Sequence, residues 1–528
     1  MIRKLHIVCI TALELFMKQS KYYFIVFIII AISIFLRFFL LQNQSLWFDE
    51  GWSLELSNGA SVQENFLKII TIEAGDKYQP LYYLVLFYWR SVFGDSEFAI
   101  RSLSSLLGVG SVITIFFTCL HIYGKKHALW SSTILAVSSF SVFYSQDARP
   151  YALLIFLTLL QIYFFSYAIT VDKSNKIIPQ LLFGILTAIG SFGSILTIIF
   201  SSAIFLSHAI VYKNLKELIR WWIPPIVFSS PMLWFYLSSP AASDPTATTV
   251  TRAGLPIITN IMFVIYGILV GTSYGPPLEK LRDQDKINVF LGYWPHFLIF
   301  IIVIAVIFIA LVRSLLKQRK RKRYKEADYF FTSLLTISFL LLLIFAVGTK
   351  INLLPRHSFF VCIPLFILIP SAFLHNYQRK NKLYIASQVP KLATVSLLLM
   401  NLYSNWQYYL NPAYAKDDYR SAVRYLIKTR NQSAKSVLLL GQDTLFRYYG
   451  DSSTIYLPDY IREDMKIKTI GEQVNVATQN ADTVYVILNR EYYWKYKDVF
   501  KVEMNDLYKL EGENDWNYIK IYRFTRKK

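Results

Sequence analysis

Long apolar runs separated by short basic clusters form the main pattern of this chain. A run of about 20 apolar residues crosses a bilayer as a helix, because each residue adds about 1.5 Å to a hydrocarbon span of about 30 Å. The pattern predicts an α-helical polytopic membrane protein with about 11 transmembrane helices. They are expected at 22–41, 98–120, 128–144, 151–170, 177–212 (two helices divided at the Gly- and Ser-rich break 190–194), 221–239, 291–315, 329–348, 358–375 and 385–404.

The basic clusters give the expected orientation. Lys and Arg gather at the N-terminus and at 125–126, 213–220, 313–325 and 379–382, and all of these fall on one side when the spans alternate. Cytoplasmic loops are enriched in Lys and Arg, so this side, with the N-terminus, is expected to face the cytoplasm. The protein is then a multi-pass protein of the plasma (inner) membrane, and residues 42–97 form its first outer loop.

Some residues and stretches near the outer face have expected structural roles. The short apolar stretches 79–93 and 257–270 are predicted as helices at the outer interface. Arg37 is expected to extend its side chain from the first span toward the interface. A structural role is also expected for the charged residues at the outer entrance of the second span, Asp95, Glu97 and Arg101.

After the last span the sequence changes to that of a soluble domain. Helical periodicity at 417–429 and short β-branched, aliphatic or alternating runs at 436–441, 483–488 and 517–524 predict a small α/β fold. We therefore divide the chain into a transmembrane domain, 1–405, and a soluble domain, 406–528. The odd number of spans puts the soluble domain on the extracytoplasmic side.

Composition narrows the classes of function. Of the 528 residues, 54% are hydrophobic, and the net charge of +21 is carried by clusters between apolar runs, which favours membrane topology over nucleic-acid binding. The three cysteines lie in or beside apolar segments, which argues against a disulfide framework or a thiolate metal site. No Walker-type glycine loop, His-Glu-x-x-His pair or Cys-x-x-Cys pair occurs in the sequence. The first apolar run lacks a cleavage site and is too long for a signal peptide, so we expect a retained anchor.

The stretch LWFDEGW at 46–52 places Asp49 and Glu50 among aromatic residues, directly after the first span. One interpretation is a solvated loop whose aromatic side chains anchor at the interface. Unpaired charge against lipid or protein is unfavourable, however, which favours a functional pair. Burial raises the pKa of such a carboxylate, which suits it to take a proton from a hydroxyl or amine nucleophile. Asp49 and Glu50 are therefore the candidate catalytic residues, and also candidate ligands of a divalent metal such as Mg or Mn.

Further polar clusters are predicted on the same outer face. Asp76 and Lys77 lie in the first outer loop, Asp147 and Arg149 follow the third span, and Arg356 precedes the tenth. A guanidinium offers paired donors to a phosphate or diphosphate, which a lysine cannot match geometrically. Taken alone, Asp147 and Arg149 are as compatible with a structural ion pair, and Arg356 with a side chain that reaches for the interface.

Three stretches carry a resemblance to a known family. They are the acidic pair in LWFDEGW, PLYYLVLFYWRSVFGDSEFAIRSLSSLLG at 80–108, and SQDARPYALL at 145–154. In this order they resemble the GT-C membrane glycosyltransferases, in the group related to protein O-mannosyltransferases and the lipid A aminoarabinose transferase. The resemblance implies a polyprenyl-phosphate sugar donor, transfer on the extracytoplasmic side and an acidic residue of the first outer loop that acts on the acceptor.

The resemblance also assigns residues. Asp49 matches the catalytic carboxylate with Glu50 beside it, and Asp147 and Arg149 match the second outer motif. This chain has Tyr78-Gln79-Pro80 where many relatives have His-Pro-Pro before Leu-Tyr-Tyr, so no histidine contact is carried over. The candidate contacts of the donor phosphate or substrate are Asp147, Arg149, Arg356, Asp76, Lys77 and Tyr82.

The predicted function is transfer of one sugar from a lipid phosphate carrier to an acceptor at the outer face, with inversion if displacement is single. Lipid, glycan and protein acceptors all stay open. The alternative is a transporter or flippase of lipid-linked sugars, which would favour charged or broken helices near the midplane and an internal repeat. A third interpretation, an outer binding module on a membrane scaffold, leaves the acidic pair unexplained.

Overall fold

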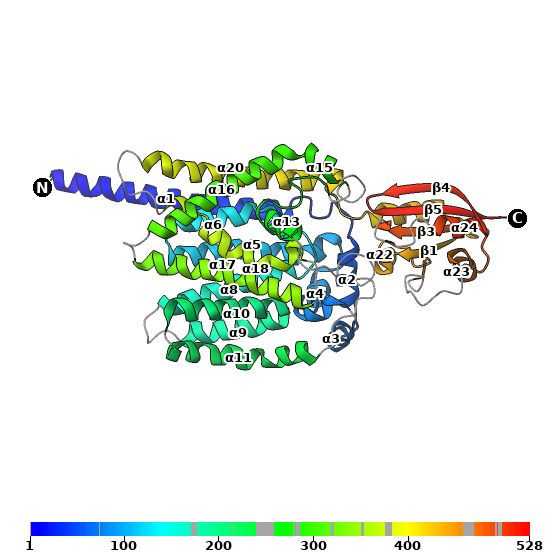
Figure 1. Cartoon of the computed structure of the whole chain (residues 1–528), viewed down its shortest axis with the longest axis horizontal. Helices are drawn as coiled ribbons and strands as arrows, with labels where there is room; N and C mark the ends of the chain where they lie inside the picture. The colour runs from blue at the N-terminus through cyan, green and yellow to red at the C-terminus, as the bar shows by residue number, and fades with distance from the viewer. Residues whose placement is uncertain are drawn as a thin grey trace.

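The computed structural model contains a helical bundle and a smaller sheet domain at one end of it (Figure 1). The N-terminus and the sheet domain lie at opposite ends of the long axis (Figure 1). The structure describes residues 2–72, 74–170, 177–213, 215–238, 258–277, 280, 286–317, 322–349, 353–374, 383–457, 469–491, 494 and 499–527. The basic cluster predicted at 379–382 lies outside these residues.

Seven of the described helical stretches are long and apolar enough to cross a membrane. They are the apolar part of α1 (Ile2–Phe38), α5 (Glu97–Ile122), α8 (Tyr151–Thr170), α10 (Ile195–Tyr212), α16 (Trp294–Lys317), α17 (Lys322–Thr349), and the stretch Pro355–Leu374 with η3 (Pro355–Ser358), α18 (Phe359–Leu368) and α19 (Ser371–Leu374). An eighth forms if α6 (Lys125–Val137) and α7 (Ser139–Ser145), bent by 57°, are one span. The structure confirms a polytopic helical fold.

The other three predicted spans are also helices, alongside the bundle in Figure 1. They are α9 (Ile177–Gly193), α11 (Leu215–Ser238) and α20 (Leu383–Leu410). None of them is among the seven that are both long and apolar enough, and α9 has only 17 residues. The predicted domain boundary at 405–406 falls inside α20.

Arg37 does not extend to the interface as expected. Its side chain is completely buried at the bend between α6 and α7, where its guanidinium donates to the carbonyls of Leu135 and Ala136 at 3.2 and 3.0 Å and to the Ser141 hydroxyl at 2.9 Å. The bend leaves carbonyls at the end of α6 without helical partners, and a buried carbonyl needs a donor. Arg37 supplies those donors across the bundle.

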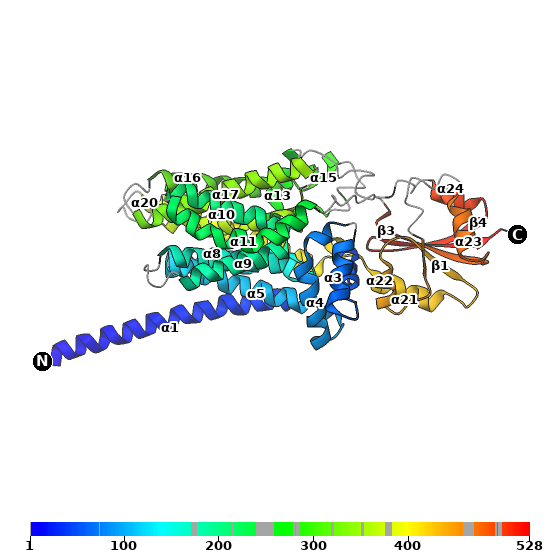
Figure 2. The same ribbon diagram turned by 90° about the horizontal axis from the view of Figure 1, so that it is seen from below.

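Four short elements lie across the end of the bundle, between it and the sheet domain (Figure 2). They are α2 (Phe48–Leu56), α3 (Val62–Thr71), η1 (Gly75–Tyr78) and α4 (Pro80–Phe93). The crosswise α4 occupies the predicted interfacial stretch 79–93. The second such stretch, α13 (Ile258–Val270), instead packs within the bundle, where its Leu269 carbonyl accepts a hydrogen bond from Asn401 at 2.8 Å.

The sheet domain holds five strands in the order β2-β1-β3-β5-β4. They are β1 (Lys435–Leu440), β2 (Ile455–Tyr456), β3 (Thr483–Asn489), β4 (Tyr508–Trp516) and β5 (Ile519–Arg526). β1 pairs in parallel with β2 and β3, whereas β5 is antiparallel to β3 and β4. The helices are α21 (Tyr419–Thr429), α22 (Asp443–Tyr448), α23 (Ile470–Ala477) and α24 (Phe500–Asn505), so the predicted α/β fold is confirmed.

The two faces of the sheet bury different side chains, because alternate strand residues point to opposite faces. One face packs with α23 and α24 into a core of the sheet domain itself. The other face contributes Leu438 and Ile487 to a second core, which also contains Leu46 and Leu54 of the first outer loop. The sheet domain and the end of the bundle beside it therefore share one hydrophobic core.

We expect Arg37→Leu to lower the stability of the full chain by about 3 kcal/mol, because buried carbonyls at the α6–α7 bend would lose their donors. The measurement is the apparent Tm of the protein in detergent. Lys21→Leu, which removes an exposed charge from the same helix, is the matched control and should leave Tm unchanged. Equal effects of the two variants would contradict the role given to Arg37.

Candidate functional site

The acidic pair lies in the first turn of α2, and its two side chains have different surroundings. Asp49 and Glu50 stand near the positive end of the helix, where carboxylates are favoured. The Asp49 side chain is 18% exposed, whereas that of Glu50 is completely buried. Adjacent helical residues point about 100° apart, since a turn takes about 3.6 residues. The helix therefore directs the two carboxylates to different partners.

Glu50 forms a buried, two-pronged ion pair with Arg101 of α5. The two carboxylate oxygens accept from Nε and Nη2 of Arg101 at 2.7 and 2.6 Å. One of them also accepts from the backbone N–H of Ala148 at 2.9 Å. Burial acts to raise the pKa of Glu50, but the charges of Arg101 and Lys416 outweigh it and lower this pKa to about 2. The expectation that burial raises the pKa of both carboxylates is therefore wrong for Glu50, which stays ionised.

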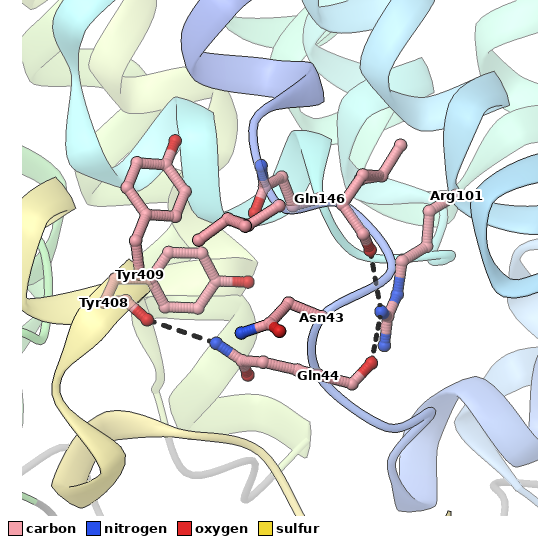
Figure 3. A pocket seen from close by; sticks show the side chains of 8 residues that line it. Asn43, Gln44, Arg101, Gln146, Tyr408 and Tyr409 are labelled. Carbon is pink, nitrogen blue, oxygen red and sulfur yellow. Dashed lines mark hydrogen bonds between the residues drawn. The ribbon is translucent and has the colours of Figure 1, made fainter.

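Arg101 joins Glu50 to the loop that leads into α2. Its remaining N–H groups donate to the carbonyls of Leu41, Gln44 and Ser45 at 2.8–2.9 Å. Figure 3 shows the first two of these bonds at the edge of a small cavity behind the loop. The cavity measures about 10 Å³, the size of one water molecule, so it does not hold a substrate. The structural role expected for Arg101 is thus the positioning of this loop and of Glu50.

Asp147 is completely buried next to the Glu50 pair. Its Oδ1 accepts from the indole N–H of Trp47 at 2.7 Å and from the Lys416 ammonium at 3.2 Å. Its Oδ2 has no hydrogen-bond partner in the described part of the chain. Burial raises the pKa of Asp147 and outweighs the opposing charge of Lys416. Lys416 also lies 3.6 Å from Glu50, so one cation serves both carboxylates.

Asp49 belongs to a second, partly exposed cluster with two arginines. Arg356 donates to the Asp49 carboxylate at 2.9 Å. Arg149 donates to the backbone carbonyl of Asp49 at 3.0 Å and to the Asp76 carboxylate at 2.6 Å, where the Tyr83 hydroxyl also donates. The Nε atoms of Arg149 and Arg356 are buried without hydrogen-bond partners among the described residues. Part of the donor capacity of both arginines is therefore unused among the described residues.

The structure brings Asp49, Glu50, Asp76, Asp147, Arg149 and Arg356 together at one end of the bundle. Tyr82 lies close enough to Glu50, Asp147 and Arg149 for their charges to act on its hydroxyl, which is buried in a 2.8 Å hydrogen bond with Ser104. The ammonium of Lys77 lies 5.1 Å from the ring centre of Tyr78, and the residue is almost completely buried.

The Asp49–Glu50 pair does not fit one shared divalent metal. Its carboxylates point to different arginines, and both oxygens of Glu50 already accept hydrogen bonds from Arg101. The described residues also contain no group of three or more His, Cys, Asp and Glu that could hold a metal ion.

The segment after α20 supplies residues that the sequence did not identify as part of the site. Besides Lys416, the buried Asp417 accepts from the backbone N–H of Phe48 at 3.3 Å and from Arg490 at 3.0 Å. Gly51 of α2 packs so closely on Gln442 that a Cβ at Gly51 would lie 2.4 Å from that side chain. The charged run Lys416-Asp417-Asp418 after the last span was the only sequence signal, and it did not reveal these partners.

Comparisons with known proteins agree with this architecture. Residues 78–237 match the family model described as dolichyl-phosphate-mannose-protein mannosyltransferase. None of the curated protein sequences compared matches the chain significantly.

Several solved structures are similar to this one. The apo structure of ArnT from Cupriavidus metallidurans matches with a TM-score of 0.56 and 10% sequence identity. The structure of the same protein bound to undecaprenyl phosphate matches with a TM-score of 0.54 and 12% identity. Each match covers 94% of this chain and 97% of the ArnT chain. The Archaeoglobus fulgidus oligosaccharyltransferase tethered with an acceptor peptide matches with 0.51 at 12% identity, covering 97% of this chain and 74% of that one. The chain therefore shares its fold along nearly its whole length with these structures, and over residues 78–237 its sequence is similar to the mannosyltransferase family model.

Proposed function

We propose that the protein transfers a monosaccharide from a polyprenyl-phosphate donor to a lipid, glycan or protein acceptor at the outer face of the membrane. The observation that carries the proposal is the partly exposed cluster of Asp49, Arg356 and Arg149, which sets a carboxylate beside arginine donors that have no partner among the described residues. The similar ArnT structure that contains undecaprenyl phosphate supports a lipid phosphate as the carrier.

Asp49 is the proposed general base. It takes the proton of the acceptor hydroxyl or amine while the acceptor atom forms a bond to the anomeric carbon. The bond from that carbon to the phosphate oxygen breaks, and its electron pair leaves with the lipid phosphate. A single displacement of this kind inverts the anomeric carbon. Arg356 and Arg149 stabilise the charge that develops on the phosphate, as fixed donors do most effectively in a site that excludes water.

Glu50 and Asp147 are proposed to position the site. Glu50 stays ionised in its pair with Arg101, so it fixes α2 and does not exchange protons. Asp147 fixes the indole of Trp47, the residue that precedes α2. Glu50 is thereby the proposed orienting partner of Asp49.

The proposed orientation has the sheet domain outside the cell and the N-terminus in the cytoplasm. Lys125 and Lys126 begin α6 at the end of the bundle opposite to the site, since α5 crosses the bundle between them and Glu97. Positive residues favour the cytoplasmic side. The site then faces the side on which a lipid-linked sugar, and no nucleotide sugar, is the available donor.

Asp49→Asn should lower the rate of sugar transfer by about a hundredfold or more, because the acceptor loses its proton acceptor. The assay incubates the purified full chain with a panel of polyprenyl-phosphate sugars and acceptors, and measures released lipid phosphate. Glu64→Gln, at an exposed carboxylate of α3, is the control and should keep full activity. Normal folding with unchanged transfer by Asp49→Asn would refute the assignment, and donor binding by the wild type without any turnover would favour a transporter.

Arg356→Lys should reduce turnover by about tenfold or more, since lysine keeps the charge but loses the planar fork of donors. The effect should appear in kcat, because the charge on the departing phosphate is largest in the transition state. Arg523→Lys, an exposed arginine on β5, is the matched control. An increase in KM alone would assign Arg356 to ground-state binding of the donor.

Glu50→Gln should destabilise the protein by about 3 kcal/mol or more, because the buried Arg101 would lose its counter-charge. The double variant Glu50→Gln/Arg101→Met should recover part of this loss. The pKa of Glu50 is lowered to about 2 in the folded protein, whereas a glutamate in the unfolded chain has a pKa of about 4.3. The contribution of ionised Glu50 to the free energy of unfolding is therefore complete above about pH 4.3 and disappears as the pH falls toward 2. Denaturant unfolding of the wild type and both variants at pH 7 and pH 3 measures this, and a double variant as unstable as Glu50→Gln would contradict it.

A further inference from the structure

A large groove lies where the outer end of the bundle meets the sheet domain, apart from the cluster around Asp49. Its volume is about 1040 Å³. The lining comes from the end of α1 with the following loop, the start of α5, and the helices α21 and α22. None of Asp49, Arg149 and Arg356 lines it. The groove is therefore separate from the proposed transfer chemistry.

One wall of the groove is apolar and lies at the membrane boundary. Phe38 is the last residue of the first apolar span, and Phe98 stands in the first turn of the span in α5. Their rings lie 6.1 Å apart, and Leu40 beside them is 37% exposed. Phe98 is itself 43% exposed. This wall therefore offers aromatic and aliphatic surface at the depth where acyl chains join their headgroups.

The opposite wall is cationic. Arg420 and Arg424 stand one turn apart on α21, on the side opposite to its buried Ala422. Arg420 is already engaged: it pairs with Glu97 and donates to carbonyls of the loop after α1. Arg424 is exposed and makes no hydrogen bond or ion pair with any residue that the structure describes. Because Arg420 neutralises Glu97, Arg424 leaves the groove with a net positive charge.

We propose that this groove binds one anionic phospholipid of the outer leaflet. Its phosphate lies against the guanidinium of Arg424, and its acyl chains lie along Phe38, Leu40 and Phe98. A zwitterionic headgroup carries the same phosphate, but its ammonium adds a positive charge beside the cationic wall, and a free phosphate makes no use of the apolar wall. The occupant that satisfies both walls is thus an anionic lipid.

A bound lipid would connect the sheet domain with the site. The groove contains Leu41, whose carbonyl accepts from Arg101, and the same Arg101 holds Glu50. On the other wall, α21 follows directly after Lys416 and Asp417, which contact Asp147 and Phe48. The lipid therefore bridges the two segments that fix α2, and it supports the docked position of the sheet domain.

The test is native mass spectrometry of the full chain in detergent, titrated with phosphatidylglycerol or with phosphatidylcholine of the same acyl chains. The wild type should retain phosphatidylglycerol preferentially, and Arg424→Ala should weaken its binding about fivefold, as expected for one cation near an anionic headgroup. Phe98→Asn should weaken binding as well, through the apolar wall. Arg523→Ala, which removes an exposed charge from β5 outside the groove, should bind as the wild type does.

Three results would overturn the proposal. They are equal affinity of the wild type for the two lipids, unchanged phosphatidylglycerol binding by Arg424→Ala, and complete displacement of the lipid by inorganic phosphate, which would make the occupant a free anion. The assay contains no sugar donor, so its outcome is independent of the proposed transferase activity. Circular dichroism of each variant confirms that it is folded.

Discussion

The buried ion pair between Glu50 and Arg101 is the interaction on which the end of the bundle beside the sheet domain depends. Two charges lose their water when they are buried, and only close, fully hydrogen-bonded geometry offsets that loss. Here every available donor of Arg101 is used, by Glu50 and by three carbonyls of the preceding loop. The first outer loop, α5 and the Ala148 turn can therefore move only together. That rigidity fixes the direction in which Asp49, the residue before Glu50 in α2, presents its carboxylate.

The sheet domain is part of this arrangement. Its side chains share a hydrophobic core with Leu46 and Leu54 of the first outer loop, and the Tyr449 hydroxyl accepts from the backbone N–H of Leu46 at 2.8 Å. Lys416 supplies a cation to both Glu50 and Asp147 from the segment that enters the domain. A binding module tethered to a scaffold would have no need of these contacts. The domain instead completes the environment of α2.

The sequence predicted the helices and strands better than it predicted which side chains contact one another. Apolar runs gave helices at all the predicted span positions, because the bilayer imposes length and composition on a helix. Arg37 was misjudged, since its acceptors are carbonyls freed by a bend almost 100 residues away in sequence. The Glu50–Arg101 pair joins residues 51 positions apart, and Lys416 reaches Asp147 over 269 positions. Hydrophobic periodicity carries no information about such pairs. The separate directions of Asp49 and Glu50, in contrast, follow from helical geometry once α2 is recognised.

The pairing of Asp49 with Arg356 has a consequence for the order of events in the proposed reaction. While Arg356 contacts Asp49, its positive charge stabilises the carboxylate and makes it a weaker proton acceptor. A donor phosphate that binds Arg356 through its remaining N–H groups brings negative charge to the same guanidinium and competes with Asp49 for it. Asp49 then becomes a stronger base when the donor is in place. Arg149 holds the backbone of Asp49 throughout, so the carboxylate can change partner without displacing α2. One arginine would thereby couple donor binding to activation of the acceptor.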